Sequence, residues 1–303
     1  MADFTSLLRD IRRICPDMEI LEQEPMARHC SFRIGGPCAA MVSPASMEEI
    51  DALCRLLKQV GEEPLLIGKG TNLLVTDNPL ERIVLRMGDR FAKVDAKNDL
   101  TLTAQSGITL AQLATAAAAR SLAGLEFAHG IPGTLGGAGS MNAGAYGGEM
   151  KDVVTSITYL DENLTLQTTD DGGFRYRHSR FSDTGAVILS ADVRLLPDTE
   201  EFIRSRMRLL MDKRKTSQPL DLPSAGSTFK RPASGFAAAM IDEAGLKGFS
   251  VGGAQVSPKH AGFVVNTGGA SFEDVRRLMA HIQETVYKNT GILLEPEVKI
   301  IEG

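Results

Sequence analysis

The segment that most constrains the fold of this chain is a glycine-rich run, GIPGTLGGAGSMNAGAYGG, at residues 130–148. Eight of its 19 residues are glycine, which allows left-handed dihedral angles and a close approach of backbone to ligand. Backbone N–H groups turned to one side form a concave anion-binding site, suited to a pyrophosphate. A flexible linker is the alternative, but Ile131, Leu135 and Met141 are unlike the polar residues of a Gly/Ser linker. We therefore expect an ordered, phosphate-binding segment.

A second glycine turn, GKGTNLLV at residues 68–75, can supply the other side of such a site. Neither segment matches the common nucleotide signatures. Asn142 stands where a dinucleotide pattern that begins at Gly137 requires glycine, and Gly68-Lys69 lacks the flanking residues of a P-loop. The sequence thus predicts a phosphate-bearing ligand held by neither a Rossmann nor a Walker turn.

The totals exclude several classes of protein. The chain has 303 residues, enough for two or three domains, and its hydrophobic fraction of 43% suits a globular core. The net charge of -5 is modest, and no Lys/Arg block suggests nucleic acid as a partner. No apolar run approaches the roughly 20 residues of a membrane span, and the N-terminus lacks a signal-peptide core. We expect a cytoplasmic protein.

The cysteines and histidines favour no metal site. Cys15, Cys30, Cys38 and Cys54 show no CxxC spacing, which favours reduced, mostly buried thiols. No second ligand lies at metal spacing from His129 or His260, so both read as core or pocket-wall residues.

Hydrophobic patterns predict three domains, at residues 1–85, 86–200 and 201–303. The first domain reads as a small α/β unit with helices at 3–14 and 46–60. Ser46 is expected to cap the helix at 46–60, with Glu49 completing a capping box. The second is dominated by period-two strands and contains a helix at 109–122. The third follows a connecting helix at 199–214. It is expected to hold helices at 236–246 and 271–290, a buried strand at 261–266 and a final strand at 292–301 with Pro296 at an edge or bulge.

Seven segments in this order resemble one family. They are CSFRIGGP (30–37), GKGTNLLV (68–75), GIPGTLGG with MNAGAYGGEM (130–150), YRHSRF (176–181), AGSTFKRP (225–232), GGAQVSPKHAGFVVN (252–266) and LEPEVKII (294–301). Together they resemble the UDP-N-acetylenolpyruvoylglucosamine reductases, and the third domain is similar to the shorter, type II form. The resemblance covers nearly the whole chain.

The resemblance implies an α+β fold: an FAD-binding domain of the vanillyl-alcohol oxidase (PCMH) type in two subdomains, and a C-terminal α/β substrate-binding domain. It implies non-covalent FAD reduced by NADPH. The reduced flavin then passes hydride to UDP-N-acetylglucosamine enolpyruvate, which yields UDP-N-acetylmuramate for peptidoglycan. The expected partners are these two substrates, without nucleic acid or membrane, and we expect a monomer.

The resemblance also implies the site residues. It makes Ser227 the proton donor, with Arg177 and Glu297 as the other catalytic groups. It places FAD against Gly68, Lys69, Gly70, Thr71, Asn72, Leu73, Gly130, Ile131, Pro132, Gly133, Thr134, Gly136, Gly137, Asn142, Ala143, Gly144, Ala145 and Tyr146. A UDP diphosphate and an N-acetyl sugar need a cation and amide partners, so Lys230, Gln255 and Asn266 are expected substrate contacts. Cys30 is a departure from the family, which more often has a hydroxyl residue at the position before Ser-Phe-Arg.

The chemistry explains why these residue types are needed. Hydride addition beside a carboxylate creates an enolate-like dianion, which a cation and a nearby acid stabilise. Arg177 can hold a carboxylate by two hydrogen bonds, although an arginine in RYRHSR also suits a surface. Ser227 can donate a proton where water is excluded, although most serines beside glycine are turn residues. Glu297 can point into the pocket in its protonated form, a hypothesis, or belong to an exposed salt-bridged face.

The residues alone leave two alternative functions open. One is an oxidase or dehydrogenase of the same flavin fold that acts on another alcohol or hydroxy acid, although such an enzyme does not need AGSTFKRP or LEPEVKII. The other is a UDP-sugar-binding protein that has lost catalysis, although Arg177, Ser227 and Glu297 are present.

Overall fold

The structure is a computed structural model that describes residues 4–302 and divides into two compact units. Unit 1 takes in the residues up to Gln23, Ala39–Lys69 and Arg82–Asp212. Unit 2 takes in Glu24–Cys38, Gly70–Glu81 and the residues from Lys213 onward. Each unit therefore combines segments that lie far apart in the sequence. The expected domain boundaries at 85 and 200 stay a prediction.

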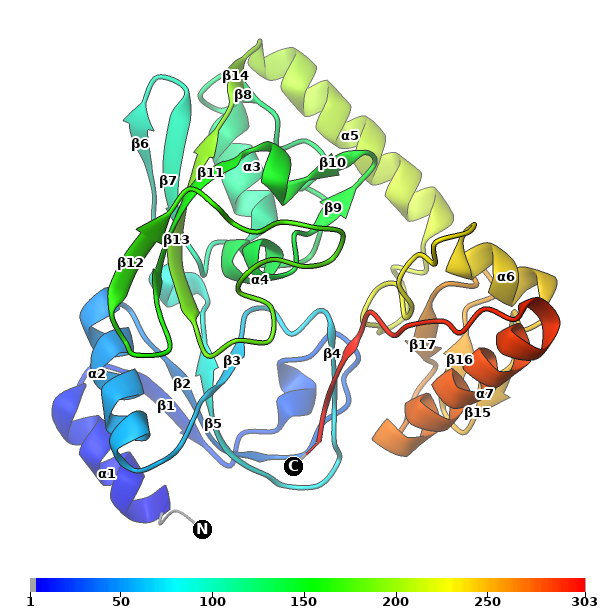
Figure 1. Cartoon of the computed structure of the whole chain (residues 1–303), viewed down its shortest axis with the longest axis horizontal. Helices are drawn as coiled ribbons and strands as arrows, with labels where there is room; N and C mark the ends of the chain where they lie inside the picture. The colour runs from blue at the N-terminus through cyan, green and yellow to red at the C-terminus, as the bar shows by residue number, and fades with distance from the viewer. Residues whose placement is uncertain (1–3, 303) are drawn as a thin grey trace. The chain divides into compact units, whose positions relative to one another are not determined.

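Two helices pack beside the first sheet of unit 1. They are α1 (Phe4–Ile14) and α2 (Met47–Gln59), which lie side by side in Figure 1. The sheet has the order β1 (Glu19–Glu22), β2 (Cys38–Ser43), β5 (Leu80–Arg86), β3 (Leu65–Ile67). Ser46 accepts a hydrogen bond from the Glu49 amide at 3.2 Å, as predicted, while the Glu49 carboxylate reaches the Ala45 amide instead of completing a capping box on Ser46. Buried side chains from both helices and the sheet form one hydrophobic core.

The second sheet of unit 1 is antiparallel throughout. Its order is β12 (Leu166–Thr169), β11 (Val154–Leu160), β13 (Val187–Arg194), β7 (Thr101–Gln105), β6 (Val94–Asn98). Helices α3 (Leu110–Ala118) and α4 (Leu135–Ser140) pack on it around a separate core. The prediction of a helix through residue 122 is wrong. The chain turns at Ser121, whose φ is 57°, and Leu122–Ala123 (β8) pair with Leu196–Pro197 (β14).

The glycine-rich segment is ordered, and it contains two elements that the sequence did not predict. Thr134 caps α4, although three of that helix's six residues are glycine. A hairpin then joins β9 (Gly144–Ala145) to β10 (Gly148–Glu149). Its two turn residues, Tyr146 and Gly147, have φ values of 55° and 89°. The type I′ turn of a two-residue hairpin requires a positive φ at both positions. Single-turn 3-10 helices lie at η1 (Met26–Arg28), η2 (Asp89–Phe91) and η3 (Met150–Asp152).

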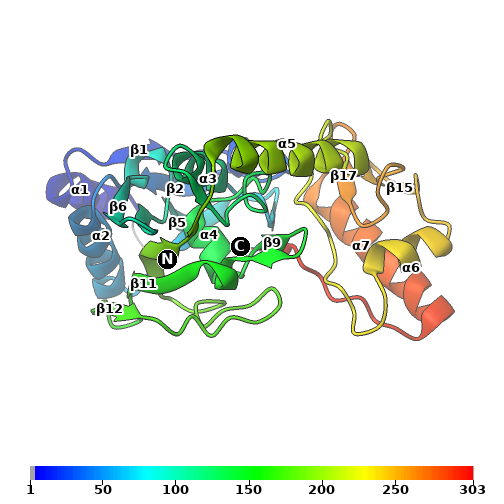
Figure 2. The ribbon, with the colours of Figure 1, turned by 90° about the horizontal axis from the view of Figure 1, so that it is seen from above.

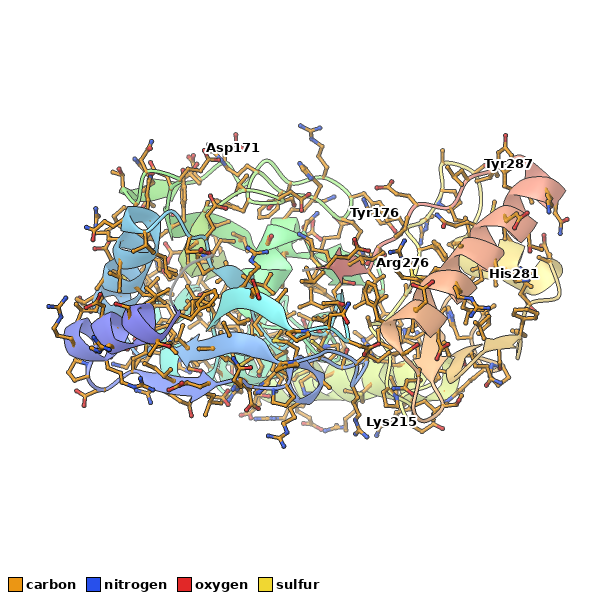
Figure 3. All side chains as sticks on the ribbon, turned by 90° about the horizontal axis from the view of Figure 1, so that it is seen from below. Asp171, Tyr176, Lys215, Arg276, His281 and Tyr287 are labelled. Atoms are coloured by element: carbon orange, nitrogen blue, oxygen red, sulfur yellow. The ribbon has the colours of Figure 1, made fainter. Side chains whose placement is uncertain are left out.

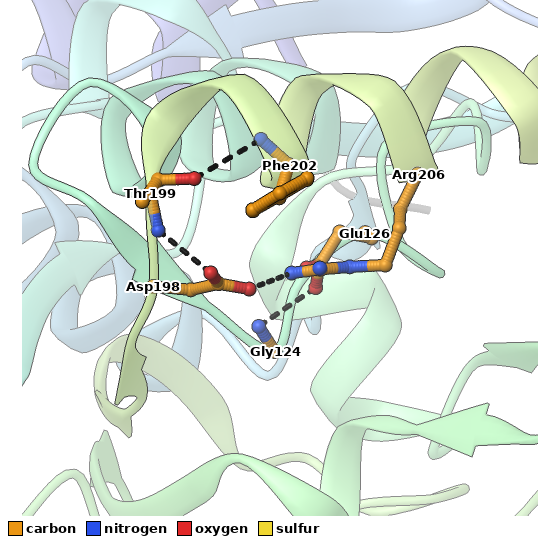
Figure 4. Close-up of polar contacts among 6 residues, drawn as sticks. All are labelled: Gly124, Glu126, Asp198, Thr199, Phe202 and Arg206. Atoms are coloured by element: carbon orange, nitrogen blue, oxygen red, sulfur yellow. Dashed lines mark hydrogen bonds and ion pairs between the residues drawn. The ribbon is translucent and has the colours of Figure 1, made fainter.

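Helix α5 (Glu200–Ser217) corresponds to the predicted connecting helix and begins in unit 1. Figure 4 shows how its first half is anchored there. Arg206 donates two hydrogen bonds to Glu126, at 2.9 and 2.6 Å, and one to Asp198 at 2.7 Å. Glu126 also accepts from the Gly124 amide at 2.7 Å. Within residues 4–302 no helix is long and apolar enough to cross a membrane.

Unit 2 packs two helices against a small antiparallel sheet. Its strands are β15 (Ser250–Val251), β16 (Ala254–Val256) and β17 (Val264–Asn266), and the helices are α6 (Ala237–Glu243) and α7 (Phe272–Thr290) (Figure 2). Ser271 and Asp274 form a capping box on α7, and Gly291 ends it with φ 72°. Figure 3 labels Arg276, His281 and Tyr287 along this helix.

The last strand is shorter than predicted. Only β18 (Lys299–Ile301) is regular, and it pairs in parallel with β4 (Leu73–Val75). Pro296 forms an isolated bridge with Phe229 instead of continuing a ladder. Proline has no N–H to donate, which explains why the regular strand begins after it.

Candidate active site

Two of the three predicted catalytic residues are neighbours in unit 2. The Lys230 amide donates to the Glu295 carbonyl and the Glu297 amide donates to the Thr228 carbonyl, both at 2.8 Å. These bonds set residues 227–230 antiparallel to residues 295–297, so Ser227 and Glu297 end up on adjacent segments. Ser227 is exposed and Glu297 is half-buried.

Thr228 anchors this pair of segments to the sheet of unit 2. It is 3% exposed, and its Oγ1 accepts a hydrogen bond from the Val264 amide at 3.0 Å while its own amide donates to the Gly262 carbonyl at 2.8 Å. Gly226 precedes Ser227 with φ 78°, a left-handed conformation that favours glycine. The buried Thr228 therefore fixes the backbone next to the exposed Ser227.

Arg177, the third predicted catalytic residue, lies in unit 1 and is half-buried. It has φ 52°, a left-handed conformation that is uncommon outside glycine. Its Nη2 donates to the Gly144 carbonyl at 3.3 Å, and its Cζ lies 5.1 Å from the ring centroid of Tyr176. Tyr176, labelled in Figure 3, is 45% exposed. The guanidinium of Arg177 thus lies over the Tyr176 ring and binds the carbonyl of Gly144, the first residue of the glycine-rich hairpin.

Within unit 1 the two segments predicted to bind FAD meet directly. A Cβ added to Gly68 would lie 2.2 Å from Thr134 Oγ1, so only glycine fits at this contact. At Gly133, by contrast, an added Cβ meets no atom of the chain within 4 Å, and its φ is not left-handed. The packing of the protein does not explain the glycine there, whereas a ligand lying against the backbone would. The segment therefore fits a bound FAD.

Most of the backbone N–H groups that were expected to bind an anion donate to carbonyl groups of the chain itself. The N–H groups of Ile131, Gly133, Leu135 and Gly136 donate to the carbonyls of Ala128, Ile131, Ile108 and Ser106. Within residues 4–302, no acceptor of the chain meets the N–H groups of Gly130 and Thr134. Any anion bound here would therefore accept hydrogen bonds from single backbone N–H groups and not from a continuous row of them.

Asn142, predicted to contact FAD, is 0% exposed, and its side chain has partners within unit 1. Its Nδ2 donates to Glu149 and to the Arg175 carbonyl, both at 2.9 Å, and its Oδ1 accepts from the Lys151 amide at 3.0 Å. This geometry makes the Asn142 side chain a structural link, and its contact with FAD stays a prediction.

The remaining predicted FAD residues, Gly70–Leu73, lie in unit 2. Gly70 has φ 61°, and an added Cβ would lie 2.0 Å from the His29 carbonyl oxygen. Asn72 donates through Nδ2 to the Glu297 carbonyl at 3.0 Å. Thus one predicted FAD residue directly supports the backbone of a predicted catalytic residue.

All four cysteines are buried and free, as predicted. Cys30 lies beside Gly70, and burial raises the pKa of its thiol to about 12. The thiol is therefore protonated at neutral pH and behaves as a small, weakly polar group.

The three expected substrate contacts all have partners in unit 2. The ammonium group of Lys230 pairs with Glu295, and Gln255 Nε2 donates to the Gly248 carbonyl at 3.2 Å and to Ser250 Oγ at 3.1 Å. Asn266 is 7% exposed, donates to the Phe32 carbonyl and accepts from the amides of Gly268 and Ala270. Lys230 and Gln255 can exchange these partners for a ligand at the surface, whereas the geometry of Asn266 supports a structural role. All three contacts stay predictions.

A cavity of about 180 Å³ in unit 2 contains cations that the sequence analysis did not assign. It is lined by Ala238, Ala239, Asp242, Lys247, Lys259, His260 and Ala261. Lys247 pairs with Asp242 at 2.6 Å, and Lys259 donates to the Lys215 carbonyl at 2.5 Å. Burial lowers the pKa of His260, whose Nδ1 accepts from the Gly262 amide. The segment SPKHAGF was the available signal, because it contains three of the lining residues, Lys259, His260 and Ala261.

A second cavity, of about 280 Å³, lies in unit 1 and contains none of the predicted site residues. It is lined by Tyr159, Asp161, Glu162, Asn163, Arg180, Phe181, Thr184 and Ala186. Asp161 accepts bonds from the amides of Asn163 and Thr165, so its carboxylate stabilises its own turn.

Comparison with protein families gives two matches. Residues 38–170 match the FAD binding domain, and residues 218–301 match the C-terminal domain of UDP-N-acetylenolpyruvoylglucosamine reductase. A protein of that name from Syntrophomonas wolfei is 44% identical over 288 residues, which is 94% of this chain and 96% of the relative. Another, from Clostridioides difficile, is 45% identical over 93% of each chain.

Solved structures agree. The crystal structure of UDP-N-acetylenolpyruvylglucosamine reductase from Thermus caldophilus has a TM-score of 0.80 at 31% identity, covering 94% of this chain and 99% of its own. An alkyldihydroxyacetonephosphate synthase shares the fold alone, with a TM-score of 0.50 at 17% identity over 65% of this chain and 41% of its own. The predicted fold, a vanillyl-alcohol oxidase type FAD domain with a separate C-terminal domain, is confirmed. The chain is therefore an oxidoreductase with an FAD-binding domain, and it belongs to the UDP-N-acetylenolpyruvoylglucosamine reductase family.

Proposed function

We propose that this enzyme reduces UDP-N-acetylglucosamine enolpyruvate to UDP-N-acetylmuramate, a precursor of peptidoglycan, with NADPH as the reductant. The observation that supports the proposal is the backbone pairing of residues 227–230 with residues 295–297, which brings the segments of Ser227 and Glu297 side by side in a chain of this family. Bound FAD would supply hydride chemistry, accepting a hydride from NADPH and donating it to the substrate.

Ser227 is the proton donor in this proposal. A serine hydroxyl is a weak acid, so it can protonate a carbon only where water is excluded and its own alkoxide is stabilised. Ser227 is exposed in unit 2, so the bound substrate itself must cover it. The cations Lys230 and Arg231 follow in the same segment, and Arg231 lies 4.5 Å from the ring centroid of Phe236. Their positive field would stabilise the alkoxide.

Arg177 and Glu297 hold the developing enolate in this proposal. The planar guanidinium of Arg177 can bind the substrate carboxylate, where negative charge grows as hydride is added. Glu297, in its acid form, donates a hydrogen bond to the same group. The backbone of Glu297 is fixed by Thr228 and Asn72, so its side chain is carried on a defined segment.

The cavity lined by Lys247, Lys259 and His260 is the best candidate for the diphosphate of the UDP group. The ammonium groups of Lys247 and Lys259 suit an anion, which would compete with Asp242 for Lys247. Lys230 and Gln255 would contact other parts of the substrate. No separate dinucleotide signature occurs in the sequence, so we propose that NADPH and the UDP-sugar use one site in turn. The proposal includes a monomeric enzyme in the cytoplasm.

Anaerobic stopped-flow spectroscopy of the flavin tests the function. The purified holoenzyme is mixed first with NADPH, which should bleach the yellow oxidised flavin. It is then mixed with UDP-N-acetylglucosamine enolpyruvate, which should restore the colour. A flavin that NADPH reduces but that this substrate does not reoxidise would contradict the proposed substrate and favour an oxidase or dehydrogenase acting on another compound. A protein that takes up no FAD would favour a binding protein without catalysis.

A further inference from the structure

The loop that carries Arg177 is tied to the glycine-rich hairpin by a partly buried polar network. At its centre is Asn142, whose amide nitrogen donates to the Glu149 carboxylate and to the Arg175 carbonyl, both at 2.9 Å. Lys151 binds the same network twice, because its amide donates to Asn142 Oδ1 and its ammonium group lies 2.9 Å from Glu149. One completely buried asparagine thus joins the hairpin, the following 3-10 helix and the residue two places before Arg177.

The carboxylate of Glu149 is placed by the hairpin itself. Glu149 is paired with Gly144 across the two strands, and a Cβ on Gly144 would lie only 2.7 Å from the Glu149 side chain. The absence of that Cβ lets the stem of Glu149 cross the hairpin. Gly144 also supplies the carbonyl that accepts from Arg177 Nη2. The residue whose carbonyl binds the guanidinium is therefore the cross-strand partner of Glu149.

The backbone in this region is held in uncommon conformations. Asn142, Tyr146 and Arg177 all have positive φ, at 45°, 55° and 52°. Such a conformation is unfavourable for a residue with a side chain and persists only when its surroundings over-determine it, as happens most often at functional sites. Tyr146 is a turn residue of the hairpin, but Asn142 and Arg177 belong to the network itself, which indicates that the position of Arg177 is specified by its surroundings.

From these contacts we infer that Glu149, fixed by Asn142, is the positioning residue for Arg177. Its negative charge attracts the guanidinium toward the hairpin, so that the planar fork is already oriented when a carboxylate ligand arrives. The field of Arg177 in turn contributes to the lowered pKa of Glu149, for which the hydrogen bond from Lys151 is the largest cause. This inference rests on the proposed function, which gives Arg177 a carboxylate to bind.

Two natural ligands of known chemistry separate the effect of Arg177 from general binding. UDP-N-acetylmuramate carries a lactyl carboxylate, whereas UDP-N-acetylglucosamine has a hydroxyl group at the same position. The ratio of their affinities for the oxidised holoenzyme, measured by titration calorimetry, therefore reports the contacts of the lactyl group, and its dependence on Arg177 reports the carboxylate contact. Glu149→Gln keeps an oxygen that can accept from Asn142 but removes the charge. We expect it to lower this ratio on the order of tenfold, with FAD retained and little change in the melting temperature.

The decisive comparison is a double-mutant cycle with Arg177→Ala. If Glu149 acts through Arg177, Glu149→Gln lowers the affinity ratio in the native background and has no further effect once Arg177 is alanine. A matched control is Glu126→Gln, which removes another largely buried carboxylate with an arginine partner, Arg206, and should leave the ratio unchanged.

An equal loss in both backgrounds, or no loss in either, would overturn the positioning role of Glu149. A native enzyme that binds neither UDP-sugar would instead refute the proposed function, and the positioning role with it. Native enzyme that binds both ligands but does not discriminate between them would contradict the role given to Arg177. The cycle therefore identifies which of the two ideas has failed.

Discussion

The amide of Glu297 donates to the carbonyl of Thr228 over 2.8 Å, and through this bond two predicted catalytic residues become neighbours. The bond belongs to the backbone, so it does not depend on the identity of either catalytic side chain. Substitution of Ser227 or Glu297 should consequently change the chemistry of the site while the two segments stay paired.

Ser227→Ala removes the proposed acid and nothing buried. We expect NADPH to reduce the flavin at the native rate, while reoxidation by the UDP-enolpyruvyl sugar slows by about 10²–10⁴-fold. Double-mixing stopped-flow spectroscopy measures both steps on one sample. Equal loss of both half-reactions would contradict a role as proton donor. Ser227→Cys should recover part of the second step, because a thiol also donates a proton.

Gly133→Ala tests the flavin site. The added Cβ meets no atom of the chain within 4 Å, so the unfolding midpoint in urea should stay near the native value. The Kd for FAD should rise by about tenfold or more if the flavin lies against this backbone. Gly70→Ala is the opposite case, because its Cβ would lie 2.0 Å from the His29 carbonyl oxygen in a left-handed conformation. That variant should lose at least about 2 kcal/mol of stability. Unchanged FAD affinity in the first variant would move the flavin away from Gly133.

Stability should fall on mild acidification. Burial lowers the pKa of His260 from its ordinary value of 6.5, and burial together with Arg204 lowers that of His129. The unfolded chain therefore binds more protons than the folded chain once the pH drops below about 6.5. The stability from the neutral histidines is complete above that pH and is lost as the pH falls through the folded values. Urea denaturation between about pH 7 and pH 5 should show this loss, and His260→Gln should reduce its slope. An identical slope in that variant would exclude His260 as the source.

Lys259→Met tests the cavity in unit 2. Methionine keeps much of the volume but removes the charge, so the Kd for UDP-N-acetylmuramate should rise by about tenfold to a hundredfold. Reduction of the flavin by NADPH should be less affected if the lysine serves the sugar nucleotide. Lys58→Met is a matched control, since Lys58 also donates to a backbone carbonyl, that of Glu162, on the surface of unit 1. A similar loss of affinity in both variants would point to a non-specific charge effect.

Local signals in the sequence predicted many elements well. The predicted cap at Ser46 marks a helix start, because its side chain accepts a bond from the backbone amide three residues on. The apolar stripe of α7 is buried as its spacing indicated. Short elements inside the glycine-rich segment escaped prediction. The cap at Thr134 was obscured by the glycines that follow it, and its helix has only six residues.

Long-range pairing could not be read from the sequence order. Residues Glu24–Cys38 and Gly70–Glu81 belong to the same unit as the C-terminal third, which no local pattern reveals. Asn142 shows the same limit at the site. The family resemblance predicted a contact of Asn142 with FAD, which stays a prediction, whereas its burial and its bonds to Glu149, Lys151 and Arg175 could not be read from the sequence.

The parallel pairing of Leu73–Val75 with Lys299–Ile301 has a consequence for synthesis on the ribosome. Asn72 finds its partner, the Glu297 carbonyl, 225 positions later in the chain. At typical elongation rates that interval is about 10–45 s, during which the earlier strand has no neighbour to pair with. Unit 1 lacks this dependence, since it ends at Asp212. Chains stalled on the ribosome before β18 has been synthesised should therefore have a folded unit 1 and an unprotected β4. Pulse proteolysis of these stalled complexes can detect the cleavage expected at β4.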